Sequence, residues 1–298
     1  MHRDHSIEVR DWTRRRFLSA TAVAVITAGA TVIAADEPRP LADIEAVLGG
    51  RVGVFALDTG SDRQLAHRAD ERFAMCSTFK WVLAAAILAR AEQGKLSLEE
   101  RVSYGKAELL DPSPITARHV AEGFMTVGSL AEAALTVSDN TAANLLLPKL
   151  GGPAGFTEFV RSLGDTVTRL DRNEPDLNSN KAGDPRDTTS PRAMAGLMRK
   201  ILCGDALSPA GRERLLGWLR ACETGKDRLR AGLPRDWVAG DKTGTGQRGA
   251  VNDVAIASPP GRAPIIVAAY LSDAESRFPA SVAAHAEIGR LVARSFNS

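Results

Sequence analysis

The sequence predicts an α+β protein in which one antiparallel sheet is built from both ends of the chain and flanked by helices. The stretch Arg51–Asp58, RVGVFALD, has the apolar content of a strand, and turn-forming residues follow it. Three more strand patterns lie in the last third of the chain, at residues 237–242, 251–257 and 263–271. Helix signals fill the region between them, so we expect an all-helical lobe inserted into a three-layer α/β/α-like arrangement.

The helix signals can be placed along the chain. Residues 41–48 predict a short helix, and apolar residues at helical spacing predict a longer one at 78–93, which Gly94 ends. A serine followed three residues later by a glutamate forms a capping box, which predicts a helix beginning at Ser129. A serine directly before a proline supplies an N-cap and a first-turn residue. The remaining helices are expected to begin at Ser190 and Ser208, with a final one over residues 279–296.

The N-terminal segment predicts export. Three consecutive arginines, Arg14–Arg16, precede an uncharged stretch at residues 19–35 that ends in small residues. A basic start, a short apolar middle and a small-residue end are typical of an export signal, and the arginines before Phe17 and Leu18 resemble a twin-arginine signal. The alternative is an uncleaved membrane anchor. It is disfavoured because the stretch is short for a bilayer span and diluted by threonine and glycine.

Residues 1–35 are therefore expected to be a signal peptide for the twin-arginine export machinery, and residues 36–298 a single exported domain. Within this domain the patterns place a sheet lobe at about 36–75 and 205–298, and a helical lobe at about 76–204. We expect the mature protein to be a monomer in the periplasm or secreted, without a stable membrane anchor.

The charge and the cysteines exclude several classes of function. Loss of residues 1–35 removes five arginines and three acidic residues, so the formal net charge falls from +2 to about zero. A neutral domain lacks the basic surface that nucleic-acid binding requires. The three cysteines, Cys76, Cys203 and Cys222, include no C-x-x-C pair, which argues against a zinc site. We expect no metal or cofactor and three buried thiols, with a Cys203–Cys222 bridge as the alternative.

Two S-x-x-K motifs could each place a serine nucleophile beside a lysine. Ser103 lies in a polar stretch with Gly105, and no helix pattern follows directly, so Lys106 is expected to be a solvated charge. Ser77 directly precedes the long helix pattern, so Ser77 and Lys80 would share one helix face. Unpaired N–H groups and the helix dipole would stabilise an oxyanion there. Taken alone, the motif is more typical of an N-cap serine with a lysine in the first turn.

Two further motifs give Ser77 a chemical context. Ser138-Asp139-Asn140 interrupts a helical pattern and Lys242-Thr243-Gly244 ends a strand pattern, and each occurs once. S-x-x-K, S-D-N and K-T-G in this order are the motif set of class A β-lactamases and penicillin-binding proteins. The chain resembles a class A serine β-lactamase over nearly its whole length, from about Leu41 to the C-terminus.

The stretch Leu170–Asn178, LDRNEPDLN, favours the β-lactamases over the penicillin-binding proteins. It is similar to the family's Ω-shaped loop, in which a glutamate and an asparagine, here Glu174 and Asn178, hold the hydrolytic water. Arg172 and Asp187 match a pair that closes this loop in the family. A penicillin-binding D,D-peptidase, or a β-lactam sensor without turnover, would share the three motifs without needing this glutamate. These two remain the alternatives.

The resemblance implies a catalytic role for five residues. Ser77 would be the nucleophile, and either Lys80, or Glu174 acting through a water, would take its proton. Ser138 would relay a proton to the leaving nitrogen, near the positive charge of Lys242. Glu174 would then activate water against the covalent acyl-enzyme, a step in which general-base assistance is typically worth ~10²–10⁴ in rate.

The resemblance also implies how a β-lactam would be bound. Backbone N–H groups of Ser77 and Thr245 would form the oxyanion hole. Thr243 and Thr245 would hold the substrate's carboxylate, and Arg228 matches an arginine that some members use for the same group. The implied substrate-binding residues are Asn140, Asn178, Thr243, Gly244, Thr245 and Arg228. The implied activity is hydrolysis of penicillins and cephalosporins, which gives antibiotic resistance.

Two positions depart from the family pattern. Pro112 stands where the family usually has an aromatic residue at the pocket rim. Cys76 is similar to a cysteine of carbapenem-hydrolysing members, which bridge it to a second cysteine just after K-T-G-T, but Gly246 occupies that position here. The bridge and carbapenem hydrolysis are therefore not implied, and we expect Cys76 to be a packing thiol.

Overall fold

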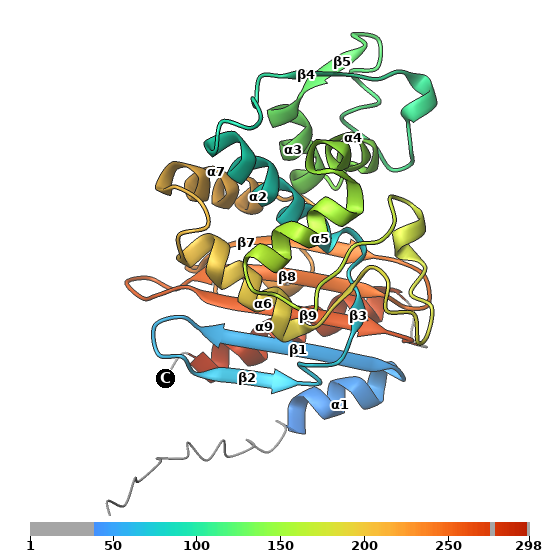
Figure 1. The fold of residues 1–298 in the computed structure, drawn as a ribbon. Helices are drawn as coiled ribbons and strands as arrows, with labels where there is room; N and C mark the ends of the chain where they lie inside the picture. Colours follow the sequence, from blue (N-terminus) through green and yellow to red (C-terminus); the bar gives the residue numbers. More distant parts are fainter. Residues whose placement is uncertain (1–38, 275–277, 297–298) are drawn as a thin grey trace, which may run out of the picture. The chain divides into compact units, whose positions relative to one another are not determined.

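The two ends of the chain pair within one antiparallel sheet, as the sequence predicts (Figure 1). The computed structural model describes residues 39–274 and 278–296, and the expected signal peptide lies outside them. In the described part the order of the five strands is β2-β1-β9-β8-β7. They are β1 (Arg51–Asp58), β2 (Gln64–His67), β7 (Val238–Thr245), β8 (Val251–Ser258) and β9 (Ile265–Ser272).

Strand β9 lies at the centre of this sheet. It pairs with β1 from Arg51 opposite Ser272 to Asp58 opposite Ile265, and with β8 on its other side. All of its residues are buried, because helices cover both faces of the sheet. Strand β7 forms one edge, and the K-T-G motif lies at its C-terminal end.

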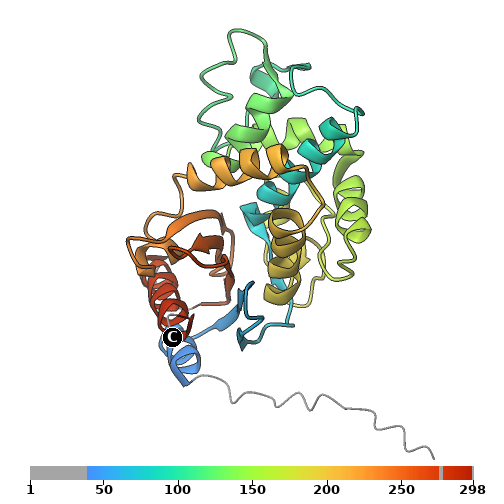
Figure 2. The ribbon, with the colours of Figure 1, turned by 90° about the vertical axis from the view of Figure 1, so that its left-hand side faces the viewer.

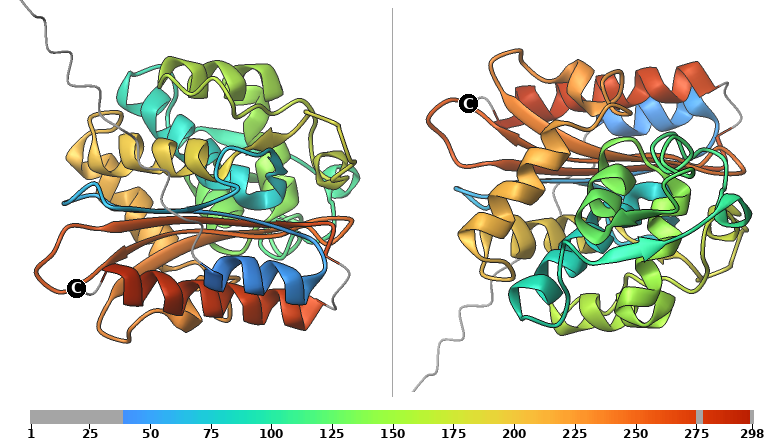
Figure 3. Two further views of the ribbon diagram at one scale, coloured as in Figure 1. Left: turned by 90° about the horizontal axis from the view of Figure 1, so that it is seen from below. Right: turned by 90° about the horizontal axis from the view of Figure 1, so that it is seen from above.

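Helices pack on both faces of the sheet. Figure 3 shows α1 and α9 together on one side of it. That face packs against α1 (Arg39–Leu48), α8 (Leu229–Gly232) and α9 (Phe278–Phe296). The opposite face packs against α6 (Pro191–Met198), which contacts β1 and β9. The sheet is therefore the middle layer of the arrangement that the sequence predicts.

The other helices gather on the side of the sheet away from α1 and α9 (Figure 2). They are α2 (Phe79–Glu92), α3 (Val127–Thr136), α4 (Asn140–Leu150), α5 (Gly152–Ser162) and α7 (Pro209–Arg220). There are also two short antiparallel ladders, β3 (Phe73–Ala74) with β6 (Thr188–Thr189) and β4 (Arg101–Ser103) with β5 (Phe124–Thr126). The lobe expected at about 76–204 is therefore not all-helical, because β4, β5 and β6 lie within it.

Helix α2 is buried on all sides. Every residue from Phe79 to Ala89 is buried, and nearly all are apolar, as expected of a helix that runs through a core. Lys80 is the charged exception and is 0% exposed. A short 3₁₀ turn, Cys76–Thr78, precedes the helix and places Ser77 at its N-terminal end.

A close approach joins the start of α2 to the edge strand β7. A Cβ on Gly244 would lie 2.7 Å from the carbonyl oxygen of Met75 and 3.1 Å from the nitrogen of Thr78. Real Cβ atoms do not approach backbone atoms this closely, so the contact requires glycine. The glycine of the K-T-G motif thus lets the strand and the helix start meet.

One predicted helix start is wrong. Helix α3 begins at Val127 rather than at Ser129, because Thr126 is the N-cap and its hydroxyl oxygen accepts from the Ser129 N–H at 3.1 Å. The starts predicted at Ser190 and Ser208 are confirmed. Their hydroxyls accept N–H bonds in the first turns of α6 and α7, at 3.2 and 3.1 Å.

The cysteines differ from expectation at one position. All three thiols are free, so the alternative Cys203–Cys222 bridge is absent. Cys76 and Cys222 are buried, but Cys203 is exposed, because it ends a π-helical turn, Arg199–Cys203, that follows α6 at the surface. Across residues 39–274 and 278–296, no helix is long and apolar enough to cross a membrane.

Candidate active site

Ser77, Lys80 and Glu174 meet in a single cluster at the start of α2. The hydroxyl of Ser77 donates to Glu174 Oε1 at 3.1 Å, and Lys80 Nζ lies 3.0 Å from the same oxygen. The side chains of Lys80 and Glu174 are both 0% exposed, whereas Ser77 is half-buried. A carboxylate thus faces a serine hydroxyl and an ammonium inside the protein, which strengthens both interactions.

The ammonium of Lys80 is surrounded by acceptors. Besides Glu174, it donates to the carbonyl oxygen of Ser138 at 2.9 Å and to Asn140 Oδ1 at 2.5 Å. Burial lowers the pKa of Lys80, and the carboxylate of Glu174 opposes that shift. With a longer contact to Ser138 Oγ at 3.4 Å, four acceptors face the three N–H donors of a protonated lysine.

Lys242 approaches the cluster from strand β7. Its Nζ donates to Ser138 Oγ at 3.0 Å and to the carbonyl oxygen of Thr243 at 2.8 Å. Burial, together with the nearby charges of Lys80 and Arg228, lowers the pKa of Lys242 to about 8. Ser138 Oγ therefore accepts from this lysine, which leaves its own proton free to point elsewhere.

The Ser138–Asn140 segment is held by its middle residue. Ser138 has a φ of 61°, in the left-handed region that non-glycine residues rarely adopt. Asp139 caps α4 by accepting from the Ala142 N–H at 2.9 Å, and it also accepts from the backbone N–H and the hydroxyl of Thr116. This anchoring holds the side chains of Ser138 and Asn140 at the two lysines.

Glu174 is fixed by two asparagines. Asn144, on α4, accepts from the Glu174 N–H at 3.0 Å and donates to its carbonyl oxygen at 2.9 Å. Asn178 donates to Glu174 Oε2 at 2.5 Å, and the Glu174–Pro175 peptide bond is cis. The sequence predictions omit Asn144. Its position one helical turn after Asn140 is the signal that could have revealed it.

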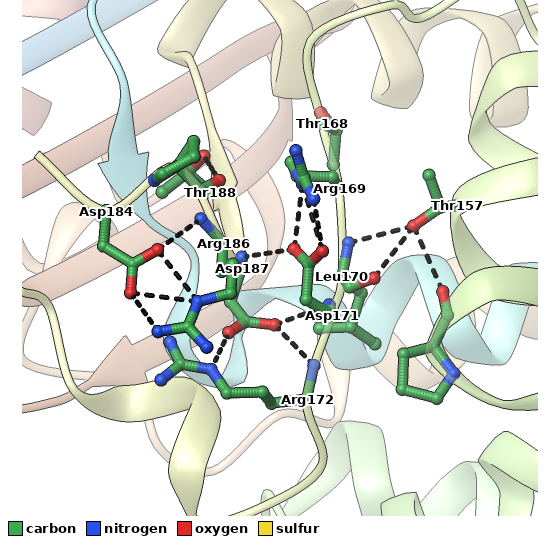
Figure 4. Close-up of polar contacts among 12 residues, drawn as sticks. Thr157, Thr168, Arg169, Leu170, Asp171, Arg172, Asp184, Arg186, Asp187 and Thr188 are labelled. Atoms are coloured by element: carbon green, nitrogen blue, oxygen red, sulfur yellow. Dashed lines mark hydrogen bonds and ion pairs between the residues drawn. The ribbon is translucent and has the colours of Figure 1, made fainter.

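The loop that carries Glu174 is closed at its neck by acidic residues (Figure 4). Arg172 Nε donates to Asp187 Oδ2 at 2.5 Å, which brings together the two residues expected to pair. The other carboxylate oxygen of Asp187 accepts from the N–H groups of Asp171 and Arg172, at 2.7 and 2.9 Å. In the reverse direction, the side chain of Asp171 accepts from the Asp187 N–H at 3.1 Å. The sequence predictions omit Asp171.

Arg228 lies behind the end of β7 and is almost fully buried. It donates to the carbonyl oxygens of Gly244 and Asn252, at 3.0 and 2.5 Å, and its Nη2 donates to Thr245 Oγ1 at 2.8 Å. Arg228 therefore reaches the pocket through the hydroxyl of Thr245. The side chain of Thr245 itself is exposed.

Comparisons with known proteins agree with this geometry. A family model described as "Beta-lactamase enzyme family" matches residues 39–296. The chain belongs to the class A β-lactamases. It is thus a serine hydrolase that opens the β-lactam ring, the reaction that gives antibiotic resistance.

This β-lactamase is similar to several known β-lactamases. It is 48% identical over 274 residues to the β-lactamase AST-1 of Nocardia asteroides, covering 92% of this chain and 88% of the relative. It is 50% identical over 233 residues to the carbapenem-hydrolysing β-lactamase KPC of Klebsiella oxytoca, covering 78% and 79%. An ancestral class A β-lactamase structure superposes with a TM-score of 0.86 at 58% identity, covering 88% of this chain and all of that one.

The two departures from the family pattern lie at this site of the β-lactamase. Pro112 is exposed, follows a cis peptide bond, and accepts from the Asn140 N–H at 3.1 Å. A Cβ on Gly246 would lie 2.6 Å from Cys76 Sγ and 2.7 Å from the carbonyl oxygen of Asn178. Cys76 thus faces Gly246, which has no sulfur with which it could form a bridge. Burial raises the pKa of its thiol to about 12.

Proposed function

We propose that this β-lactamase hydrolyses penicillins and cephalosporins through an acyl-enzyme on Ser77, with Glu174 as the general base. The observation that carries the proposal is the shared contact of Ser77 Oγ and Lys80 Nζ with Glu174 Oε1, at 3.1 and 3.0 Å. A nucleophile in hydrogen-bond contact with its base is the geometry that acyl transfer requires.

The contacts of Lys80 support this choice of base. Four acceptor oxygens face its nitrogen, which suits an ammonium, and an ammonium has no lone pair available for a proton. The Ser77 hydroxyl instead donates to Glu174, directly here and through a water when substrate occupies the pocket. Lys80 then stabilises the carboxylate before transfer and the alkoxide that attacks the lactam carbonyl.

The remaining steps of acylation use groups around the two lysines. The N–H groups of Ser77 and Thr245 would stabilise the tetrahedral oxyanion, and losing one such donor typically costs ~10²–10³ in rate. Ser138 accepts from Lys242 and keeps its own proton for the leaving nitrogen. As the lactam C–N bond breaks, Ser138 gives that proton to nitrogen. The proton that Glu174 took from Ser77 would then pass by Lys80 to Ser138, because Lys80 Nζ lies 3.0 Å from Glu174 Oε1 and 3.4 Å from Ser138 Oγ, and Glu174 would again be a carboxylate.

Deacylation depends on the Ω-loop, which we define as residues Leu170–Asp187. Glu174 and Asn178 would hold a water against the acyl carbonyl, and the carboxylate would take the proton of that water as it attacks. The 2.5 Å bond between Asn178 and Glu174 supports this arrangement. The ester on Ser77 then breaks, and the serine regains its proton.

The substrate carboxylate would bind at the end of β7. Thr243 and Thr245 would donate their hydroxyls, Gly244 would allow the close approach of backbone, and Arg228 would supply positive charge from behind Thr245. The acyl side-chain amide would meet Asn140, which Lys80 holds in place.

The decisive test compares the wild type with Glu174→Ala using nitrocefin and benzylpenicillin. The wild type should turn over both substrates. The variant should accumulate acyl-enzyme, visible by mass spectrometry as a stable adduct on Ser77. Stable acylation of the wild type without turnover would instead identify a penicillin-binding D,D-peptidase or a β-lactam sensor.

We further propose that residues 1–35 direct export by the twin-arginine route, so that a monomeric domain of residues 36–298 acts in the periplasm or outside the cell. The consecutive arginines before an apolar stretch support this route. Replacing Arg14 and Arg15 by lysine should block translocation. Unchanged export of the double variant would favour the general secretory route.

A further inference from the structure

A third threonine, Thr224, is exposed and contacts one of the two threonines proposed to bind the substrate's carboxylate. Thr224 lies between α7 and α8, and its hydroxyl oxygen is 2.6 Å from the hydroxyl oxygen of Thr243. Thr224 Oγ1 is also 3.3 Å from Cys222 Sγ, and this sulfur lies 3.7 Å from Asp241 Oδ2. A chain of two hydroxyls and a thiol therefore ends at a residue that should contact substrate.

The Cys222 thiol and the hydroxyls of Thr224 and Thr243 each carry one proton. The hydrogen bonds that link them can therefore run in either of two directions. In the outward direction Cys222 donates to Thr224, Thr224 donates to Thr243, and the proton of Thr243 is free for the pocket. In the inward direction Thr243 donates to Thr224, Thr224 donates to the sulfur, and the thiol donates to Asp241. Only the outward direction lets Thr243 donate to a substrate.

Thr245 has no such ambiguity. The guanidinium of Arg228 has donors only, so its 2.8 Å bond makes Thr245 Oγ1 an acceptor and directs the hydroxyl proton of Thr245 away from the arginine. Thr243 is 5% exposed, and its partner is the hydroxyl of Thr224 rather than a guanidinium. This hydroxyl can accept as well as donate, so it does not by itself fix the direction of the Thr243 proton.

We propose that Thr224 is a positioning residue that directs the hydroxyl proton of Thr243 at the substrate's carboxylate. A charge-assisted hydrogen bond is roughly twice as strong as a neutral one, so a bound carboxylate selects the outward direction of the chain. Burial raises the pKa of Cys222, so its sulfur keeps the proton that the outward direction needs. The inference rests on the proposed role of Thr243 in substrate binding.

The test is the kinetics of Thr224→Val, which removes the hydroxyl and keeps the shape of the side chain. With nitrocefin, KM should rise about 2- to 10-fold while kcat stays unchanged, because the Thr243 hydroxyl loses the neutral hydrogen bond that orients it and this orientation serves substrate and transition state equally. Thr224→Ser keeps the hydroxyl and should restore the wild-type KM. A change confined to kcat, or no recovery in the serine variant, would contradict a positioning role.

Two controls tie the effect to the carboxylate and to Thr243. With nitrocefin methyl ester, which lacks the carboxylate, wild type and Thr224→Val should have the same KM. In a Thr243→Val background, adding Thr224→Val should change nothing further. An equal rise in KM with the ester would overturn the inference. If the wild type does not turn over nitrocefin, both the proposed function and this inference are overturned. If the wild type turns it over and Thr224→Val has an unaltered KM, only this inference is overturned.

Discussion

At the scale of single residues, the two buried lysines differ in their partners. Lys80 pairs with the carboxylate of Glu174, whereas Lys242 bonds only to the neutral oxygens of Ser138 and Thr243 among the described residues. Burial lowers the pKa of both, and that of Lys242 falls to about 8. The charge of Lys242 is therefore expected to change close to neutral pH.

This difference predicts an alkaline limb in the pH–rate profile. Lys242 is protonated below its pKa of about 8, so kcat/KM for benzylpenicillin should fall as the pH rises through that value in the free enzyme. Lys242→Arg keeps its charge at high pH and should lose this limb, even if its maximum rate is lower. If kcat/KM of the arginine variant fell at high pH with the same midpoint, a group other than Lys242 would cause the fall.

The two S-x-x-K motifs predict opposite outcomes for two serine substitutions. Ser77→Ala should abolish nitrocefin turnover, because the hydroxyl that contacts Glu174 is lost. Ser103→Ala should keep the wild-type kcat/KM, because Ser103 and Lys106 are both exposed. Activity that survives the first change and disappears with the second would overturn the assignment of the nucleophile.

At the scale of elements, one face of helix α4 supports the Ω-loop. Asn144 bonds both backbone groups of Glu174 and so replaces the hydrogen bonds that a strand or helix would have supplied. Asn140, one turn earlier, bonds Lys80. The helix therefore sets the position of the base relative to the lysine.

This role predicts a deacylation defect in Asn144→Leu. Leaving the N–H and C=O of Glu174 unpaired should lower the free energy of unfolding by about 1–3 kcal/mol and displace the carboxylate. Nitrocefin hydrolysis should show a burst followed by a slower steady rate, measured by stopped-flow absorbance. Asn144→Asp keeps the acceptor for the Glu174 N–H and should show a smaller defect. A steady rate equal to the wild type in Asn144→Leu would exclude this support role.

The sequence predicts elements well where the signal is local, and less well where it depends on contacts. The serine N-caps of α6 and α7 were predictable because each serine bonds within its own first turn. The start of α3 was missed because Thr126 is also a good cap, and two adjacent candidates cannot be ranked by pattern alone. Asp171, Asn144 and Thr224 were missed because their partners lie 16, 30 and 19 residues away.

At the scale of the whole molecule, two carboxylates of the sheet are buried beside helix α8. Asp241 pairs with Arg230 at 2.5 Å, and Asp253 accepts from the Leu229 N–H at 3.0 Å. Burial, and for Asp253 the charge of Asp241, raises the pKa values of both groups. The folded protein therefore binds a proton here more tightly than the unfolded chain does.

This linkage predicts how stability depends on pH. A carboxyl whose pKa is raised by folding stabilises the protein below its unfolded pKa of about 4, and that contribution is lost as the pH rises through the folded value. Asp253→Asn removes the charge, so its melting temperature should exceed that of the wild type at pH 8, and the difference should shrink toward pH 4. A variant less stable than the wild type at every pH would show that the hydrogen bond outweighs the charge.

The overall architecture was predictable because the two ends of the chain carry strands and the middle carries helices. Which residues would converge was predictable only through the three motifs and the Ω-loop, since local patterns do not report long-range distances. The close approach at Gly244 illustrates this limit. Its need for glycine comes from Met75 and Thr78, which belong to a different element nearly 170 residues earlier in the chain.

The burial of α2 has a practical consequence for following the protein through folding, storage or export. Ser77 lies in the 3₁₀ turn that leads into α2, a helix whose residues from Phe79 to Ala89 are all buried, so fraying of a surface segment should not reposition the nucleophile. Activity should be lost in the same cooperative event that dissolves the core. The rate at which a chromogenic substrate is hydrolysed should then report the amount of folded protein, in a crude extract or on a plate, without purification or a structural probe.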